Sequence, residues 1–242
     1  MYVFSEKFDK SISLTTSQIQ TKFSRPPVQD PLNAPYSMEA PLEEQVHASI
    51  QKSLQNLRHD DNEQSSYIDT LILHSPYPDF ADTIRAWRVF ESYIPDRVRA
   101  LGISNITLPV LKQLYAAVET KPAFVQLRFH SESEFAAPIR RFCAEKDIVF
   151  QAHKVLKGNQ ALLESDLLRD IASEVGVSRE MALYLCVLGL PGSLQVVNGT
   201  KSEDHMREDL DSLKIFQQWY LSPDHQTSWD QKMILFNGLI GD

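Results

Sequence analysis

The sequence contains little glycine and little cysteine for its length. It has 8 glycines in 242 residues, whereas glycine makes up about 7% of an average chain. It carries no glycine-rich phosphate loop of the GxGxxG or GxxxxGK type, which argues against the common nucleotide-binding loops. Its two cysteines, Cys143 and Cys186, have neither metal-type nor redox-type spacing. We therefore expect free thiols in a reducing compartment and no metal site.

Long apolar stretches and an excess of positive charge are also missing. The longest apolar stretch, residues 181–190, is about half as long as a membrane span requires. The first ten residues, MYVFSEKFDK, carry charges and resemble neither a secretory signal nor a transit peptide. The net charge of −8 repels phosphate backbones and anionic membranes. We therefore expect a cytoplasmic protein with no nucleic-acid or membrane partner.

Short β-type runs alternate with segments of helical periodicity along the chain. The predicted strands are residues 17–23, 67–73, 97–103, 122–127, 148–152 and 194–197. The predicted helices are residues 38–57, 80–93, 107–119, 134–146, 162–175, 179–188 and 203–219. Six strand-then-helix repeats predict an α/β fold with a parallel sheet covered by helices, as either a (β/α) barrel or a doubly wound sheet.

Segments of this sequence, in this order, resemble the aldo-keto reductase family. They are IQTK at residues 19–22, YIDTLILHSP at 67–76, VRALGISN at 98–105 followed by PAFVQ at 122–126, and VNGTKSEDHMREDL at 197–210. The resemblance covers residues from about 17 to 218. It implies a (β/α)8 TIM barrel and an NADP-dependent carbonyl chemistry.

The resemblance also assigns catalytic positions. The family reduces carbonyl groups with a tyrosine acid, a lysine that lowers the tyrosine pKa, an aspartate paired with the lysine, and a histidine that orients the carbonyl. By position, Lys22 is the lysine and His74 the histidine. Taken without the family, Lys22 is typical of a solvated lysine at a strand end, and His74 of a buried imidazole bonded to backbone.

The resemblance further assigns residues that would contact NADP(H). Ser104, Asn105 and Gln126 match the positions that hydrogen-bond the nicotinamide amide, and His153 falls where an aromatic ring stacks on it. The positions around the adenosine phosphate are Gly199, Thr200, Lys201, His205 and Asp209. Here Gly199 and His205 align with a lysine and an arginine of other members, which leaves Thr200 and Lys201 as the anion contacts. The alternative is a helix N-terminus with polar residues and no ligand.

The resemblance leaves no place for the catalytic aspartate and tyrosine. The family places both further upstream than the 21 residues that precede Lys22. We therefore expect a modified barrel that lacks the first two βα units, and such a barrel has open strand edges. Residues 1–4 as a replacement strand, the apolar tail at 221–242, or a second subunit could cover them. We favour one barrel domain at residues 1–220, a tail at 221–242 that packs on it, and a homodimer.

Three functions follow from these observations. The first is a former reductase that catalyses a non-redox step on a natural-product-type small molecule, such as cyclisation, dehydration or isomerisation. In that case Lys22, His74, His130 or His153 would handle protons, and no cofactor would be required. The second is a conventional NADPH-dependent carbonyl reductase. The third is a binding protein without catalytic activity.

Overall fold

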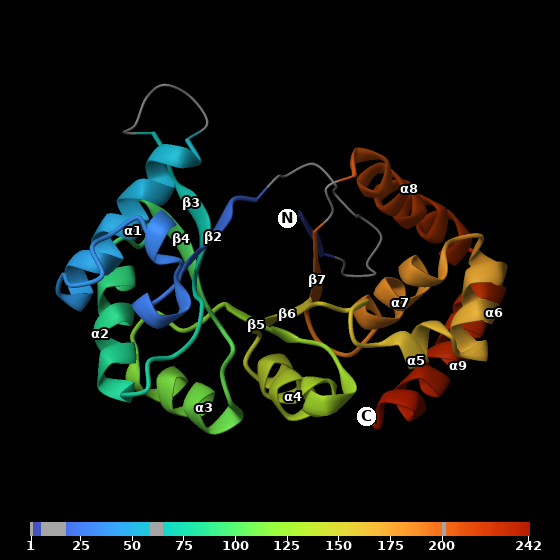
Figure 1. Cartoon of the computed structure of the whole chain (residues 1–242). Helices are drawn as coiled ribbons and strands as arrows, with labels where there is room; N and C mark the ends of the chain where they lie inside the picture. Colours follow the sequence, from blue (N-terminus) through green and yellow to red (C-terminus); the bar gives the residue numbers. More distant parts are fainter. Residues whose placement is uncertain (1, 6–17, 59–64, 200–201) are drawn as a thin grey trace. The chain divides into compact units, whose positions relative to one another are not determined.

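The computed structural model describes residues 2–5, 18–58, 65–199 and 202–242, and its chain divides into two compact units (Figure 1). Unit 2 comprises Ser13–Gln126, and unit 1 comprises Met1–Ile12 together with Leu127–Asp242. The strand β5 (Phe124–Arg128) contains the boundary between them. Each unit is described by itself below.

Unit 2 is a parallel sheet built from consecutive βα units. Its elements are β2 (Gln20–Phe23), the 3-10 turns η1 (Pro26–Val28) and η2 (Pro31–Asn33), α1 (Leu42–Asn56), β3 (Ile68–Leu73), α2 (Phe80–Glu91), β4 (Val98–Ser104), α3 (Leu108–Ala117) and the first residues of β5. The strands lie in the order β5-β4-β3-β2. Lys22 pairs with Ile72, Ile72 with Gly102, and Ser104 with Gln126. Because all strands are parallel, their carboxyl ends meet at one edge of the sheet.

The helices of unit 2 pack through the apolar faces that the sequence predicts. Val46, Ile50 and Leu54 of α1 are buried at a spacing of four residues. Phe23 at the end of β2 packs against Phe90 of α2, with ring centroids 6.2 Å apart. Alternate side chains of a strand point to opposite faces, so Phe23 inserts among the helices while its neighbour Lys22 lies on the other face of the sheet.

Unit 1 combines a second set of strands with most of the helices. Its elements are β1 (Tyr2–Ser5), η3 (Ser131–Ala136), α4 (Ala137–Glu145), β6 (Val149–His153), α5 (Gln160–Leu163), α6 (Asp166–Val175), α7 (Arg179–Leu188), β7 (Leu194–Asn198), α8 (Glu203–Tyr220) and α9 (Pro223–Ile240). The strands β6 and β7 are parallel, with Phe150 opposite Leu194. The strand β1 is antiparallel to β7, with Tyr2 opposite Asn198. A strand at the amino terminus was one of the three ways we considered for covering an open edge.

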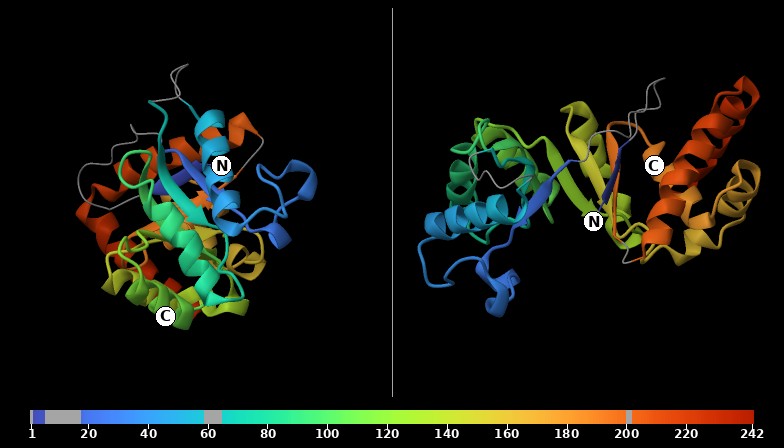
Figure 2. Two further views of the ribbon diagram at one scale, coloured as in Figure 1. Left: turned by 90° about the vertical axis from the view of Figure 1, so that its left-hand side faces the viewer. Right: turned by 90° about the horizontal axis from the view of Figure 1, so that it is seen from above.

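The carboxyl-terminal segment forms α9 and packs within unit 1. Its buried residues Trp229, Met233, Phe236 and Ile240 follow a helical spacing, and Trp229 contacts Phe216 of α8 with ring centroids 4.8 Å apart. The helix also contacts α6. Figure 2 shows α8 and α9 next to each other from two further sides. The division into a domain at residues 1–220 and a tail at 221–242 stays a prediction.

The predicted order of six strands and their helices is confirmed, and the structure adds β1 and α9. Three helices differ at their starts: α1 begins at Leu42, and the segment predicted as one helix at 162–175 is divided into α5 and α6. The helix predicted from residue 134 begins at Ala137, after the turn η3. Glu134, Phe135 and Ala136 have φ values of 48°, 49° and 55°, a left-handed conformation that cannot continue an α-helix. Among the helices of the described ranges, none is long and apolar enough to cross a membrane.

Candidate functional site

Of the residues expected around the carbonyl and the nicotinamide, all except His153 lie at the same edge of unit 2. Lys22 lies in β2, His74 directly follows β3, Ser104 ends β4, Asn105 follows it, and Gln126 lies in β5. These are the carboxyl ends of four neighbouring parallel strands, the edge at which βα folds place their catalytic groups. The resemblance to the aldo-keto reductase family assigned these positions, and their roles stay a prediction.

Hydrogen bonds connect these side chains to one another. Lys22 Nζ donates to Gln126 Oε1. Ser104 Oγ donates to the main-chain oxygen of Gln126 over 2.8 Å, and Asn105 Nδ2 donates to the main-chain oxygen of His74 over 2.8 Å. Asn105 has a φ of 52°, which asparagine tolerates better than most residues. The four strand ends thus hold one connected polar group.

Burial lowers the pKa values of Lys22 and His74. Desolvation lowers the pKa of the Lys22 ammonium below its usual value, because a low-polarity environment disfavours the charged form. Desolvation also lowers the pKa of His74, and the positive charges of Lys22 and Arg25 lower it further. His74 is therefore neutral at pH 7, and its buried Nδ1 has no hydrogen-bond partner among the described residues.

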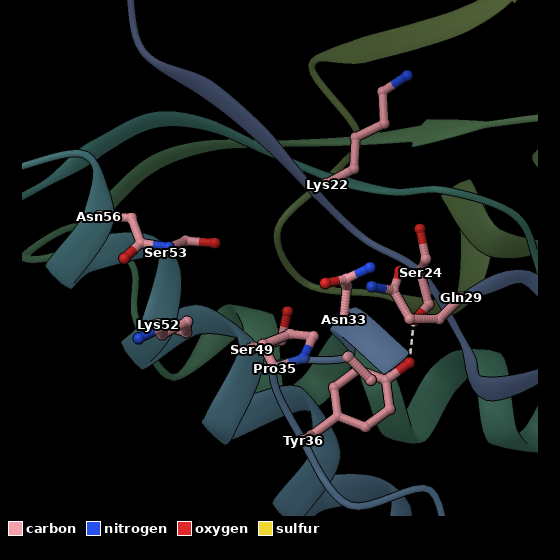
Figure 3. Close-up of a pocket in the computed structure, with 11 residues that line it drawn as sticks. Lys22, Ser24, Gln29, Asn33, Pro35, Tyr36, Ser49, Lys52, Ser53 and Asn56 are labelled. Carbon is pink, nitrogen blue, oxygen red and sulfur yellow. Dashed lines mark hydrogen bonds between the residues drawn. The ribbon is translucent and has the colours of Figure 1, made fainter. Parts of the chain in front are cut away.

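A polar pocket of about 360 Å³ lies beside this group in unit 2 (Figure 3). Its lining comes from β2, the loop after it and α1: Lys22, Ser24, Gln29, Asn33, Ala34, Pro35, Tyr36, Ser49, Lys52, Ser53 and Asn56. The Tyr36 hydroxyl donates to the main-chain oxygen of Ser24. Figure 3 shows the Lys22 side chain extending away from the other lining residues, consistent with its bond to Gln126.

The two further histidines predicted to handle protons belong to unit 1. His153 ends β6, and its main-chain oxygen accepts a hydrogen bond from Phe129 over 3.1 Å. His130 precedes η3, with its Nδ1 4.0 Å from a carboxylate oxygen of Glu132. Since Lys22 and His74 lie in unit 2, a joint role for the four residues stays a prediction.

The segment expected at the adenosine phosphate lies between β7 and α8 in unit 1. Gly199 N donates to Asn198 Oδ1 over 2.7 Å, and Asn198 Nδ2 donates to Asp209 Oδ2 over 3.0 Å. The backbone of His205 donates to Ser202 Oγ over 3.3 Å, which caps α8. Thr200 and Lys201 lie outside the described residues.

The two ends of an NADP(H) molecule are matched unequally by the described residues. At the nicotinamide end, the Asn105 amide uses its nitrogen on His74 and keeps its oxygen, which can accept a bond from the nicotinamide amide. At the phosphate end, Glu203 and Asp204 occupy the first turn of α8. Two carboxylates oppose a phosphate there, because like charges repel.

Two residues that the sequence did not point out, Arg25 and Ser75, lie next to the predicted group, together with Tyr77 of a loop that we expect to line the substrate site. Arg25 follows β2, and Ser75 and Tyr77 follow His74 after β3. Arg25 Nε, Ser75 Oγ and Tyr77 OH are buried and have no hydrogen-bond partner among the described residues. The only sequence signal for Arg25 and Ser75 was their distance of one to three residues from Lys22 and His74.

Comparison with known proteins defines the class to which this fold and site belong. Residues 13–217 match the model of the aldo/keto reductase family, and the chain is a member of that family. The glyoxal reductase of Bacillus subtilis is 32% identical over 129 residues, which are 52% of this chain and 43% of that protein. The chain spans about half the length of the curated relatives it matches.

Solved structures support the same fold. An aldo/keto reductase of Brucella melitensis superimposes with a TM-score of 0.63 at 22% identity, over 83% of this chain and 69% of that one. An aldo-keto reductase of the silkworm Bombyx mori, solved in complex with NADPH, gives a TM-score of 0.57 at 17% identity, over 83% of this chain and 63% of that one. The alternating βα units are thus part of an aldo-keto-reductase-type (β/α)8 barrel, and the alternative of a doubly wound sheet is set aside.

Proposed function

We propose that the strand-end group of unit 2 binds the carbonyl oxygen of a small molecule and catalyses a non-redox proton transfer, as in an isomerisation, dehydration or cyclisation. The observation that supports this most is the partner of Lys22. Its Nζ is bonded to the neutral amide of Gln126, and no carboxylate among the described residues pairs with it. A buried amine without an acidic partner exchanges protons more readily than an ion-paired lysine.

Each step of this transfer has a group to perform it. In its deprotonated form, which burial favours, the Lys22 amine takes a proton from the carbon next to the carbonyl, so that a C–H bond breaks and an N–H bond forms. The electron pair moves to the carbonyl oxygen, which the neutral His74 imidazole binds through an N–H group. The Lys22 ammonium then returns the proton to a different atom of the same molecule. No electrons leave or enter, so this function needs no cofactor.

A second function, NADPH-dependent carbonyl reduction, is supported by a different observation. Ser104, Asn105 and Gln126 are held together by hydrogen bonds, and the family resemblance places them at the nicotinamide amide. The named Bacillus relative is a reductase of glyoxal. NADPH would supply a hydride to the carbonyl carbon when bound. The chain's own residues would orient the amide and, through His74, the carbonyl oxygen.

Proton exchange in D₂O tests the first function directly. Methyl pyruvate is a suitable probe, because its acetyl methyl group is attached to the ketone carbon. Replacement of these protons by deuterium is visible in the proton NMR spectrum, and the ester methyl signal serves as the reference. The protein should accelerate this exchange, and Lys22→Ala should reduce the acceleration by about 10²- to 10⁴-fold, the usual contribution of a general acid–base group. Lys22→Arg should reduce the acceleration of exchange by a similar factor, since arginine keeps the charge but does not release its proton.

The matched control is Lys214→Ala, which removes an exposed lysine of α8 and should leave the exchange rate unchanged. Exchange that is absent from the unaltered protein, or that persists in Lys22→Ala, contradicts the proposal. Oxidation of NADPH at 340 nm, in step with loss of methyl pyruvate, favours the second function instead. Binding of methyl pyruvate without either reaction favours the non-catalytic alternative. The homodimer and the cytoplasmic location remain predictions, and sedimentation of the purified protein would measure the first of them.

A further inference from the structure

Arg25 lies in a hydrogen-bonded turn, and its Nε has no hydrogen-bond partner among the described residues. Its main-chain oxygen accepts hydrogen bonds from Val28 N over 3.0 Å and Gln29 N over 3.2 Å, and Pro26 follows it, so the backbone is fixed. Its side chain is half-buried, with a buried Nε that bonds to nothing among the described residues. Buried guanidinium groups are normally paired with an anion. An unpaired one is consistent with an anion supplied by a ligand.

The strand register places Arg25 beside the group after β3. Phe23 pairs with Leu73, and the main-chain oxygen of Phe23 accepts a hydrogen bond from His74 N over 2.9 Å. Residues 24–25 and 74–75 are therefore the first residues after two paired strand ends. His74 Nδ1 and Ser75 Oγ are both buried without a partner among the described residues. Several polar atoms that need a hydrogen bond thus meet at the ends of two adjacent strands.

The charge at this point is positive. Arg25 and Lys22 both lower the pKa of His74. Burial is the largest of the effects that raise the pKa of Tyr77 to about 12, and Arg25 opposes this rise. These influences agree with the strand register, which brings the end of β2 next to the end of β3. The carboxylate of Asp82, which also influences Tyr77, is bonded to Arg85 over 2.8 Å. It is therefore not the missing partner of Arg25.

The type of anion follows from the available donors. A guanidinium group binds a carboxylate through two parallel hydrogen bonds, and hydroxyl groups such as those of Ser75 and Tyr77 can add further bonds. Phosphate sites usually rely on several backbone N–H groups at a helix start or a glycine-rich loop. Here four residues close to Arg25 and Ser75 are prolines, which have no N–H group: Pro26, Pro27, Pro76 and Pro78. The N–H group of Tyr77, between two of them, is already bonded to Thr83 Oγ1 over 2.8 Å.

We propose that Arg25, with Ser75 and Tyr77, binds the carboxylate of a substrate whose carbonyl group lies at Lys22 and His74, so that the substrate class is the oxo acids. This inference rests on the proposed function for the position of the carbonyl group, but it assigns a separate site and a separate role. Arg25 is a specificity residue: it selects substrates that carry an acid group, and it takes no part in the proton transfer.

Paired probes test this assignment by calorimetric titration. Pyruvate and levulinate are oxo acids with different spacing between carbonyl and carboxylate, and their methyl esters lack the charge. At least one acid should bind about 10- to 100-fold more tightly than its ester, the range typical of hydrogen bonds to a charged group. Arg25→Gln should reduce this ratio to near one without weakening ester binding, and Arg25→Lys should restore only part of it, because an ammonium lacks the planar fork.

The control is Arg169→Gln, which removes an exposed guanidinium from α6 and should leave the ratio unchanged. Equal binding of acids and esters, or a preference that survives in Arg25→Gln, overturns the inference. Inorganic phosphate that binds through Arg25 more tightly than either acid overturns the choice of carboxylate. The two proposals can fail separately. If the protein prefers acids through Arg25 but shows no proton exchange that depends on Lys22, the catalytic role is wrong and the carboxylate site stands. If the ester exchanges its protons through Lys22 but acids bind no better than esters, the carboxylate site is wrong and the catalytic role stands.

Discussion

Unit 2 and unit 1 treat their buried polar groups in different ways. In unit 1, the buried Arg140 pairs through one terminal nitrogen with Asp242 over 2.8 Å, although its other terminal nitrogen has no partner among the described residues, and Lys232 pairs with Glu174 over 2.6 Å. In unit 2, Lys22 has only an amide partner, and Arg25 and His74 keep buried nitrogen atoms without partners among the described residues. Paired charges between helices are typical of a scaffold. Unpaired buried groups at strand ends are typical of a binding site, because they cost stability unless a ligand satisfies them.

The helices of the two units also differ in how much of their apolar surface is buried. Every residue of α7 from Met181 to Leu188 is buried, and α9 lies against the end of α7, since a Cβ added to Gly189 would be 3.0 Å from Met233 Sδ. The helices of unit 2 bury narrower faces, such as Leu111 and Leu114 of α3. We therefore expect core substitutions to have their largest effects in unit 1, and substitutions that alter chemistry to have theirs in unit 2.

The largest expected effect on stability is that of Phe236→Ala in α9. Phe236 is fully buried, and removing a buried phenyl ring costs about 3 to 5 kcal/mol, because the transfer free energy is lost and a cavity remains. Amide hydrogen exchange should show loss of protection in α6, α8 and α9, with that of β2 to β4 unchanged. Leu235→Ala is the matched control: Leu235 is 60% exposed, so its loss should change stability by less than about 0.5 kcal/mol. Equal effects of the two variants would contradict the packing described for α9.

The fold could be predicted from the sequence because its signals are local. Alternation of β-type and helical segments depends on periods of a few residues, and the predicted strand at 67–73 differs from β3 (Ile68–Leu73) by one residue. The positions of Lys22 and His74 at strand ends followed from the same signals. The turn η3 did not, because Glu134 and Phe135 adopt left-handed conformations that neither residue type favours.

The partners of the site residues could not be predicted in the same way. Lys22 and Gln126 are 104 residues apart in the chain, and nothing near either residue indicates the contact. Family resemblance assigned Gln126 to the nicotinamide, and the structure shows that its side-chain oxygen also accepts a bond from Lys22. Arg25 is a stronger case, since its significance lies in the lack of a partner, which only the folded arrangement of β2 and β3 reveals. Local pattern therefore predicts where a site forms, and tertiary contacts determine its chemistry.

A smaller effect is expected from Gly102→Ala in the sheet of unit 2. A Cβ at this position would lie 2.9 Å from both Cβ and the main-chain oxygen of Phe124, so β4 and β5 would have to move apart. Overpacking of this kind costs about 1 to 3 kcal/mol. The movement should also displace Gln126, two residues further along β5, and change the apparent pKa of the Lys22-dependent proton exchange.

Gly238→Ala in α9 provides the contrast. No atom lies within 4 Å of the Cβ that it would add, and alanine favours a helix over glycine by about 1 kcal/mol. The same substitution should therefore destabilise the protein in β4 and stabilise it in α9, as measured by urea denaturation. Destabilisation by Gly238→Ala would show that a neighbour approaches α9 more closely than the described residues do.

The smallest effect is a pH dependence that should be confined to unit 2. The pKa of His74 is lowered from its usual value near 6.5 by burial and by the charges of Lys22 and Arg25. Below about pH 6.5 the unfolded chain therefore binds a proton more readily than the folded one, and stability falls as the pH decreases through this window. The imidazole is only partly buried, so solvent reduces the effect. His74→Gln should remove it, and Arg25→Gln should weaken it because one of the two opposing charges is gone. Hydrogen exchange at pH 7.5 and pH 5 would measure the change in local stability of β2 and β3 between the two pH values. An identical change in the unaltered protein, His74→Gln and Arg25→Gln would contradict the effect of His74 described here.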